Sequence, residues 1–224
     1  MSVHPELIDI EKQADGWVKK YVLTYKMPDG TLHEYHCATR RDEEDYRAGL
    51  ERNGKASREV LTALKAGEPA PSVPAFTPDA VCIVARTPRD TIVMEREFRY
   101  PLNSWCIALP AGLIDPGESV LACADRELQE ETGYAVVPGT EARILPQAGY
   151  SSTGLTDETV QVVFVEAEKA GDAHTEGSEL IEVFELPIAD IGPFMEANRL
   201  PIGTRAQLVL EALRMQCECE RPSS

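Results

Sequence analysis

The stretch GLIDPGESVLACADRELQEETGY, residues 112–134, predicts a turn followed by a helix that carries a cluster of carboxylates. Its residues 115–117, Asp-Pro-Gly, have the composition of a turn, and Gly133 stands where helices commonly end. We therefore expect a helix over residues 118–132. Three acidic residues lie close together within it: Glu127, Glu130 and Glu131. Crowded like charges are unfavourable, so this cluster requires a partner of opposite charge.

The faces of this helix follow from a rotation of about 100° per residue. Four apolar residues form the stripe expected to face the core: Val120, Leu121, Ala124 and Leu128. Glu131 falls inside this arc and Glu127 lies at its edge, whereas Asp125 and Gln129 lie on the solvent side. A glutamate-rich helix ordinarily presents a solvated face, and the position of Glu131 argues against that interpretation.

Carboxylates at the margin of a buried face are costly unless something neutralises them. Arg126 is a single cation and offsets only part of the charge of these glutamates. Carboxylate oxygens are hard ligands that suit Mg²⁺ or Mn²⁺, which proteins bind with a few carboxylates, waters and substrate phosphate oxygens. The helix therefore predicts a divalent-cation site.

Composition and charge narrow the classes of function. The 224 residues are 43% hydrophobic and 27% charged, as in soluble globular proteins. No apolar run reaches the roughly 18 residues of a membrane span, and residues 1–15 do not resemble a secretory signal. We expect a cytoplasmic protein that binds no membrane. The formal net charge of −16 opposes nucleic-acid binding, and it would repel a phosphate ligand unless metal cations intervened.

The six cysteines predict reduced thiols. An even number of cysteines is compatible with disulfides, but nothing in the sequence indicates secretion, so we expect free and mostly buried side chains. Cys217 and Cys219 look like half of a metal site, yet no second Cys or His pair stands at zinc-finger spacing. A structural zinc site is therefore not expected.

The order of predicted elements indicates an α+β protein with two parts. Residues 17–40 predict two strands around a turn, residues 42–65 a helix, and residues 66–78 a linker rich in Pro and Ala. The predicted elements after the linker are strands at 80–85, 91–98, 105–112 and 160–168 and a final helix at 204–218. We place a boundary between an N-terminal β-strand domain with a helical insert, residues 1–76, and a second domain, residues 77–224, that contains the carboxylate-rich helix.

The carboxylate-rich stretch resembles the Nudix box, G-x5-E-x7-R-E-U-x-E-E-x-G-U, in which U is a bulky aliphatic or aromatic residue. Every specified position is filled, by Gly112, Glu118, Arg126, Glu127, Leu128, Glu130, Glu131, Gly133 and Tyr134. The box covers about a tenth of the chain. The resemblance implies an α/β/α sandwich around a mixed sheet, and a Nudix hydrolase that cleaves a nucleoside diphosphate linked to another moiety.

The residues before the box resemble the ADP-ribose and ADP-sugar pyrophosphatases of this family. Residues 97–101, Glu-Phe-Arg-Tyr-Pro, and 109–112, Leu-Pro-Ala-Gly, stand where that subgroup has Q-F-R-x-P and E-x-P-A-G. The resemblance implies a homodimer in which the small N-terminal β domain, similar to residues 1–40, is exchanged between partners. It also implies four substrate-binding residues: Trp17 and Tyr35, whose rings would clamp the adenine, and Arg40 and Arg99. Sheet or dimer packing of the rings and a surface position of the arginines remain open.

The loop at residues 149–161 resembles the substrate loop of the ADP-ribose enzymes, S-P-G-x-x-x-E. Ser152, Gly154 and Glu158 fit this pattern, and Thr153 replaces the usual proline. That departure keeps other nucleoside diphosphate sugars, and dinucleotides, as alternative substrates. The insert at residues 42–76 is a second departure.

The resemblance assigns roles to individual residues. Glu127 and Glu131, one helical turn apart, are the expected principal ligands of Mg²⁺, for which Mn²⁺ would substitute. The remaining expected ligands are Glu118, Glu130 and the carbonyl of Ala111. Arg126 is expected to orient the carboxylates, Glu130 to act as a ligand or base, and Glu158 to be the general base. Glu158 is alternatively a solvent-exposed loop carboxylate.

The expected reaction is hydrolysis of ADP-ribose or a related ADP-sugar to AMP and a sugar phosphate. An alternative of a different class is a Nudix domain that senses a nucleotide without cleaving it. The intact box and the lack of a basic segment argue against that alternative.

Overall fold

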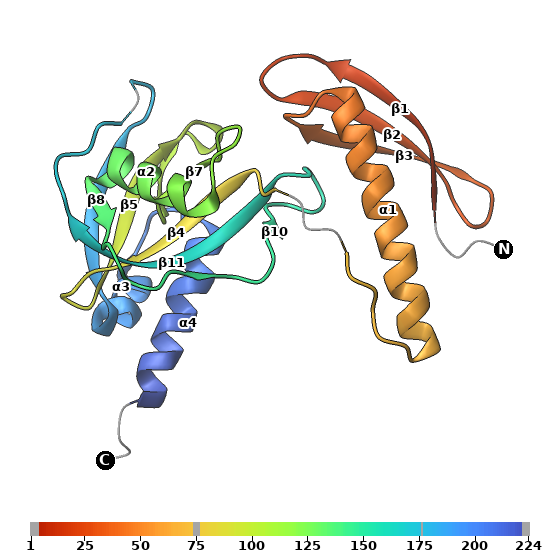
Figure 1. Cartoon of the computed structure of the whole chain (residues 1–224). Helices are drawn as coiled ribbons and strands as arrows, with labels where there is room; N and C mark the ends of the chain where they lie inside the picture. Colours follow the sequence, from red (N-terminus) through yellow and green to blue (C-terminus); the bar gives the residue numbers. More distant parts are fainter. Residues whose placement is uncertain (1–4, 74–76, 176, 221–224) are drawn as a thin grey trace. The chain divides into compact units, whose positions relative to one another are not determined.

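The computed structural model describes residues 5–73, 77–175 and 177–220, and these residues form two compact units (Figure 1). The first unit contains the described residues up to Thr77 together with Tyr150–Thr159. The second unit contains Pro78–Gly149 and the described residues from Val160 onward. The loop at 150–159 therefore belongs with the N-terminal part of the chain, although it lies between two segments of the second unit.

The first unit is built on an antiparallel sheet of three strands, in the order β1-β2-β3. These strands are β1 (Glu6–Ala14), β2 (Lys19–Lys26) and β3 (Leu32–Thr39). Gly30, with a φ of 88°, occupies the turn between β2 and β3, where a residue without Cβ is favoured. The sequence did not indicate β1, because only Ile10 of its nine residues is buried and four of the nine are charged.

The helical insert packs on this sheet through its first turns. Helix α1 (Glu43–Ala66) ends at Gly67, which adopts the left-handed conformation and whose N–H caps the last turn. Tyr46 is the buried residue of α1, and it packs against Tyr21 and Cys37 in the core of the first unit. Three acidic residues at the positively polarised start of the helix are Glu43, Glu44 and Asp45.

The second unit is built around a mixed sheet. Its strand path is β10-β11-β4-β5-β12, and shorter strands β6, β7, β8 and β9 pair with β5, β4, β11 and β11. The bounds of the central strands are β4 (Ala80–Arg86), β5 (Thr91–Arg99), β11 (Thr159–Lys169) and β12 (Ile181–Pro187). Those of the short strands are β6 (Ser104–Ala108), β7 (Ala111–Leu113), β8 (Tyr134–Val136), β9 (Arg143–Ile144) and β10 (Gly149–Tyr150). β11 runs parallel to β4, whereas β12 runs antiparallel to β5.

Helices cover both faces of this sheet, which gives three layers (Figure 1). The helical elements are α2 (Val120–Thr132), α3 (Ile191–Ala197), α4 (Thr204–Glu220) and the short 3-10 turns Tyr100–Leu102 and Ile188–Asp190. Alternate residues of a strand point to opposite faces. Val81 and Ile83 of β4 therefore pack with α2, and Cys82 and Val84 pack with α3 and α4. The α/β/α sandwich expected from the Nudix box is confirmed.

Several local expectations are corrected by the structure. The strand expected at 105–112 is divided into β6 and β7 by Leu109 and Pro110, and the Pro110 carbonyl accepts a hydrogen bond from the N–H of Ile83 at 2.8 Å. β12 and α3 were not expected at all. All six cysteines are free, with Cys37, Cys82, Cys106 and Cys123 buried. None of the helices in the described parts of the chain has the length and apolar character of a membrane span.

Candidate active site

The carboxylates are presented by a helix whose two ends are fixed locally. Ser119 precedes α2, and its Oγ accepts a hydrogen bond from the N–H of Ala122 at 3.2 Å, which caps the start of the helix. Gly133 ends it with a φ of 69°. A Cβ at Gly133 would lie 2.4 Å from the Gly171 carbonyl oxygen, so glycine is required for both backbone conformation and space.

The core-facing side of α2 matches the helical geometry in part. Glu131 is only 7% exposed and lies beside the buried Leu128, as its place inside the apolar arc predicts. Leu121, which the same geometry placed on the core side, is 43% exposed, whereas its neighbour Val120 packs against the core. Asp125 is half-buried rather than solvated, because its carboxylate accepts a hydrogen bond from the Val136 N–H at 2.8 Å.

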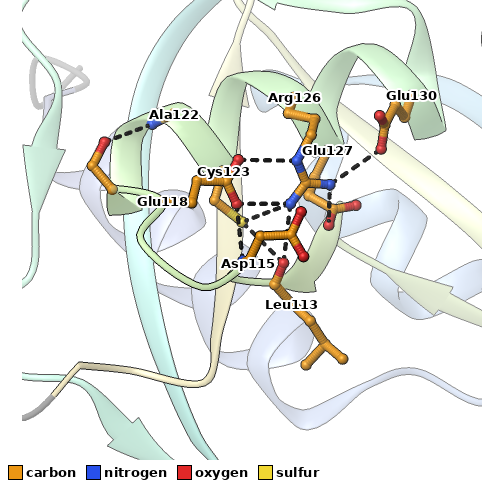
Figure 2. A network of polar contacts seen from close by, with 9 residues as sticks. Leu113, Asp115, Glu118, Ala122, Cys123, Arg126, Glu127 and Glu130 are labelled. Carbon is orange, nitrogen blue, oxygen red and sulfur yellow. Dashed lines mark hydrogen bonds and ion pairs between the residues drawn. The ribbon is translucent and has the colours of Figure 1, made fainter.

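Arg126 lies at the centre of a network of carboxylates (Figure 2). Its Nε and Nη2 donate to the two oxygens of Glu118 at 3.0 and 2.9 Å. Its Nη1 donates to Glu127 at 2.8 Å and to Glu130 at 3.2 Å, and Nη2 also reaches the Leu113 carbonyl at 3.0 Å. These bonds lower the pKa of Glu118 to about 2 and raise that of Arg126. Arg126 thus orients three of the box carboxylates.

Gly112 leaves the space that the Glu127 carboxylate occupies. A Cβ at Gly112 would lie 1.9 Å from Cδ of Glu127 and within 2.3 Å of both its oxygens, which is far inside van der Waals contact. Burial raises the pKa of Glu127, and the hydrogen bond from Arg126 opposes that change. The glycine of the box therefore has a direct physical reason here.

Glu131 is not part of the network in Figure 2 but is held by β7, the strand that precedes the turn at residues 115–117. Its Oε2 accepts a hydrogen bond from the Ala111 N–H at 3.0 Å. Burial raises the pKa of Glu131, and the negative charge of Glu95 raises it further. Since Ala111 begins β7, the expected carbonyl ligand and this carboxylate lie next to each other.

Two further carboxylates in the site were not found from the sequence. Glu95 of β5 is 1% exposed, and Glu179, half-buried, stands just before β12. The charge of Glu179 raises the pKa of Glu95, Glu127 and Glu131, which places it within electrostatic reach of all three. The available signal for Glu95 was an acidic residue that directly follows the four buried residues Thr91–Met94 of β5. Glu179 lies in a segment with no recognisable pattern.

These residues fit a divalent cation. Among the residues that the structure describes, no three His, Cys, Asp or Glu side chains are arranged as a preformed metal site, and Arg126 and the Ala111 N–H hold the box carboxylates. The buried Oε1 of Glu95 nevertheless has no hydrogen-bond partner, and several carboxylates converge on one arginine. An excess of hard oxygen donors with an unsatisfied buried oxygen is the chemistry that Mg²⁺ or Mn²⁺ satisfies.

The remaining predicted residues are divided between the two units. In the first unit, Arg40 forms an ion pair with Glu158 at 2.6 Å, and the Tyr35 hydroxyl donates to the Gly154 carbonyl at 2.8 Å. Trp17 is 73% exposed in the turn before β2. In the second unit, Arg99 pairs with Glu97 at 2.5 Å. Tyr35 and Arg40 thus both contact the loop at 150–159, which contains Glu158.

Known proteins with similar sequences include several pyrophosphatases. The chain is 34% identical to ADP-ribose pyrophosphatase of Bacillus subtilis over 150 residues, which are 66% of this chain and 72% of that protein. It is 29% identical to ADP-ribose pyrophosphatase of Saccharomyces cerevisiae over 174 residues, 77% of this chain and 64% of the yeast protein. It is 33% identical to ADP-sugar pyrophosphatase of Mus musculus over 60% of this chain and 62% of the mouse protein. The matched regions thus span less than two thirds of the yeast and mouse proteins.

The fold and the family are shown by two further comparisons. A crystal structure of ADP compounds hydrolase superposes with a TM-score of 0.67, covers 98% of both chains and is 18% identical, so it supports the fold alone. The family model described as the NUDIX domain matches residues 76–205, which is more than half of the chain and includes every carboxylate of α2. Together with the complete box, this match establishes that the chain belongs to the NUDIX domain family.

Proposed function

We propose that this protein is a hydrolase that cleaves the pyrophosphate bond of ADP-ribose or a related ADP-sugar, releasing AMP and a sugar phosphate. The observation that carries the proposal is the arrangement of Glu127 and Glu131 on one side of α2, with Arg126, itself paired with Glu118, holding Glu127 in place. The pyrophosphatases of Bacillus, yeast and mouse, by their names, act on ADP-ribose and ADP-sugars.

The carboxylates define where a divalent cation would be held. We assign Glu127 and Glu131 as principal ligands, with Glu118, Glu130 and the Ala111 carbonyl as further ones. Mg²⁺ is the proposed ion, and Mn²⁺ would replace it. A bound cation of this kind lowers the pKa of water and neutralises charge on phosphate oxygens. The part of Arg126 is to keep the carboxylates oriented, since its guanidinium bridges three of them.

The proposed substrate contacts are two aromatic and two arginine side chains. Trp17 and Tyr35 offer ring faces to the base, and Arg40 and Arg99 offer guanidinium groups to phosphate or ribose oxygens. Each arginine is ion-paired in this structure, Arg40 with Glu158 and Arg99 with Glu97. A substrate phosphate would therefore compete with a carboxylate for each of them.

Glu158 is the proposed general base, and its environment sets a condition for that role. Its carboxylate pairs with Arg40 at 2.6 Å and accepts a hydrogen bond from the Ser151 hydroxyl. Both carboxylate oxygens are therefore already engaged, one by the guanidinium and one by the hydroxyl. Release of Arg40 toward substrate would free Glu158 to accept a proton from water.

A panel of nucleotide substrates tests the proposal. We expect Mg²⁺-dependent release of AMP from ADP-ribose with a kcat/KM above that for other nucleoside diphosphate sugars and for dinucleotides. A higher kcat/KM for another compound would favour the alternative function, a NUDIX hydrolase with a different substrate. Thr153, in place of the proline usual in ADP-ribose enzymes, is compatible with that alternative. Tight binding of ADP-ribose without cleavage of any compound would identify a nucleotide sensor. The homodimer and the cytoplasmic location remain predictions from the sequence.

A further inference from the structure

Strand β5 places an acidic side chain where the sheet would otherwise carry an apolar one. Ile92 and Met94 point to the face covered by α3 and α4, and Val93 points to the face covered by α2. Because side chains alternate along a strand, Glu95 lies on the same face as Val93, beneath α2. At 1% exposed, it is the most buried carboxylate among the described residues.

The surroundings of Glu95 are acidic. It lies within hydrogen-bonding reach of Glu131, and the charges of Glu97, Glu179 and Glu127 act on it. Its Oε1 has no hydrogen-bond partner in the described structure. Buried polar atoms are almost always paired, because an unpaired one forfeits its hydration without compensation. Glu95 is therefore costly to the fold unless a ligand uses that oxygen.

The neighbouring arginines do not supply the missing partner. Arg96, on the opposite side of β5, lies over the Phe184 ring, with Cζ 4.4 Å from the ring centroid. Arg99 pairs with Glu97, and Arg126 pairs with Glu118, Glu127 and Glu130. A buried carboxylate that contacts another carboxylate, and has an unused oxygen, is suited to a small divalent cation.

We propose that Glu95 is an additional oxygen ligand of the divalent cation at this site, contributed by the sheet, whereas Glu127 and Glu131 are contributed by helix α2. This inference rests on the proposed function, because it assumes the cation. It assigns to the site a residue outside the Nudix box and names the strand that supplies it.

The test is the affinity for Mn²⁺ of the full chain and of Glu95→Gln, measured without substrate by calorimetry and by electron paramagnetic resonance of free Mn²⁺. Glutamine has the same shape but loses the anionic oxygen. We expect binding of Mn²⁺ to weaken by about 10- to 100-fold. The metal-free variant should unfold at the same temperature or higher, because glutamine avoids the cost of burying an ionisable carboxyl group. Glu182→Gln, which removes an exposed charge ion-paired with Arg96, is the matched control and should leave the affinity unchanged.

A second measurement separates a ligand from a residue that merely supports Glu131. The amide NMR shift of Ala111 reports the hydrogen bond to Glu131. If Glu95 is a ligand, this shift stays unchanged in the metal-free variant while the affinity falls. A moved shift with a lower affinity would overturn the ligand assignment, as would an unchanged affinity. If Glu95→Gln does not fold, Glu95→Asp keeps the charge but withdraws the oxygen, and unchanged binding by it would also overturn the proposal.

The wild-type measurement distinguishes this proposal from the one on which it rests. If wild-type protein fails to bind Mn²⁺, the cation site of the proposed function is wrong, and with it the role of Glu95. If wild-type protein binds Mn²⁺ and Glu95→Gln binds it equally well, only the role of Glu95 is wrong.

Discussion

At the scale of single residues, steric fit determines the geometry of the candidate site as much as charge does. Gly112 is a position where any side chain would overlap the Glu127 carboxylate, and Glu131 is a buried carboxylate held by one backbone N–H. The effect of each residue depends on its neighbour, Glu127 for Gly112 and the Ala111 N–H for Glu131. Substitutions that change one property while keeping the others are therefore the informative ones.

Gly112→Ala should disable the site while leaving the fold intact. The added methyl group would lie 1.9 Å from Cδ of Glu127, so that side chain must move away from the position in which Arg126 holds it. We expect hydrolysis of ADP-ribose to fall by about 100-fold, as for the loss of a group that orients ligands. Gly171→Ala is the control, because a Cβ there meets nothing within 4 Å and the residue lies outside the candidate substrate loop. Equal activity of the two variants would contradict the contact.

Glu131→Gln should abolish most activity without destabilising the protein. A glutamine oxygen can still accept the hydrogen bond from the Ala111 N–H, but it carries no charge for a cation. We expect kcat to fall by at least about 100-fold, with a melting temperature that is unchanged or raised, because glutamine avoids the cost of burying an ionisable carboxyl group. Exposed Glu168→Gln should behave as wild type. Near-normal turnover of Glu131→Gln would refute the metal assignment.

At the scale of elements, β12 is tied to its surroundings through one carboxylate. Glu185 accepts hydrogen bonds from Thr91 of β5, from Tyr134 of β8 and from Arg89. Partial burial opposes its ionisation, but these three donors outweigh burial, so the pKa of Glu185 lies below its usual value of 4.5. The ionised carboxylate joins three segments of the second unit.

Stability should therefore depend on pH through Glu185. A carboxylate with a lowered pKa in the folded state stabilises the fold above the unfolded pKa of about 4.5 and loses that contribution as the pH falls through the folded pKa. We expect Glu185→Gln to cost about 1–3 kcal/mol in the free energy of unfolding at pH 7, and less at pH 3. Denaturant titrations at both pH values measure this difference, with Glu182→Gln of the same strand as control. An equal cost at both pH values would show that packing, not charge, is responsible.

Elements whose sequence pattern is contiguous could be predicted. Contacts that arise from the pairing of strands distant in sequence could not. Helix α2 and its carboxylates could be identified because turn, box and cap are contiguous in sequence. Glu95 and Glu179 join the same site only because β5 and β12 pair, with Glu95 opposite Val183, and no pattern in the sequence specifies that register. β1 and α3 were not predicted for a simpler reason, since β1 is mostly exposed and α3 is only seven residues long.

At the scale of the whole molecule, the loop at 150–159 is part of the first unit. The Ala38 N–H donates to the Leu155 carbonyl at 2.9 Å, Arg41 pairs with Asp157 at 2.6 Å, and Arg40 pairs with Glu158. The loop that resembles a substrate loop is thus organised by residues of the N-terminal strands.

Arg41→Met should loosen this loop selectively. The Arg41 and Asp157 side chains are 29% and 19% exposed, so we expect their ion pair to contribute about 1 kcal/mol, at the upper end for pairs near the surface. Amide hydrogen exchange of residues 151–158 should then accelerate about fivefold, while exchange in α2 stays the same. Arg86→Met, which removes an exposed pair with Asp90, is the control. Unchanged exchange in the loop would show that its backbone bonds suffice.

The chain passes between its two units three times, after Thr77, after Gly149 and after Thr159. A hybrid protein made by grafting the N-terminal residues of a relative onto this catalytic region would inherit foreign partners for Asp157 and Glu158. Recombination between family members is therefore expected to succeed only when the N-terminal residues and the loop at 150–159 are exchanged together. Substrate preference would then travel with the pair of segments and not with either one alone.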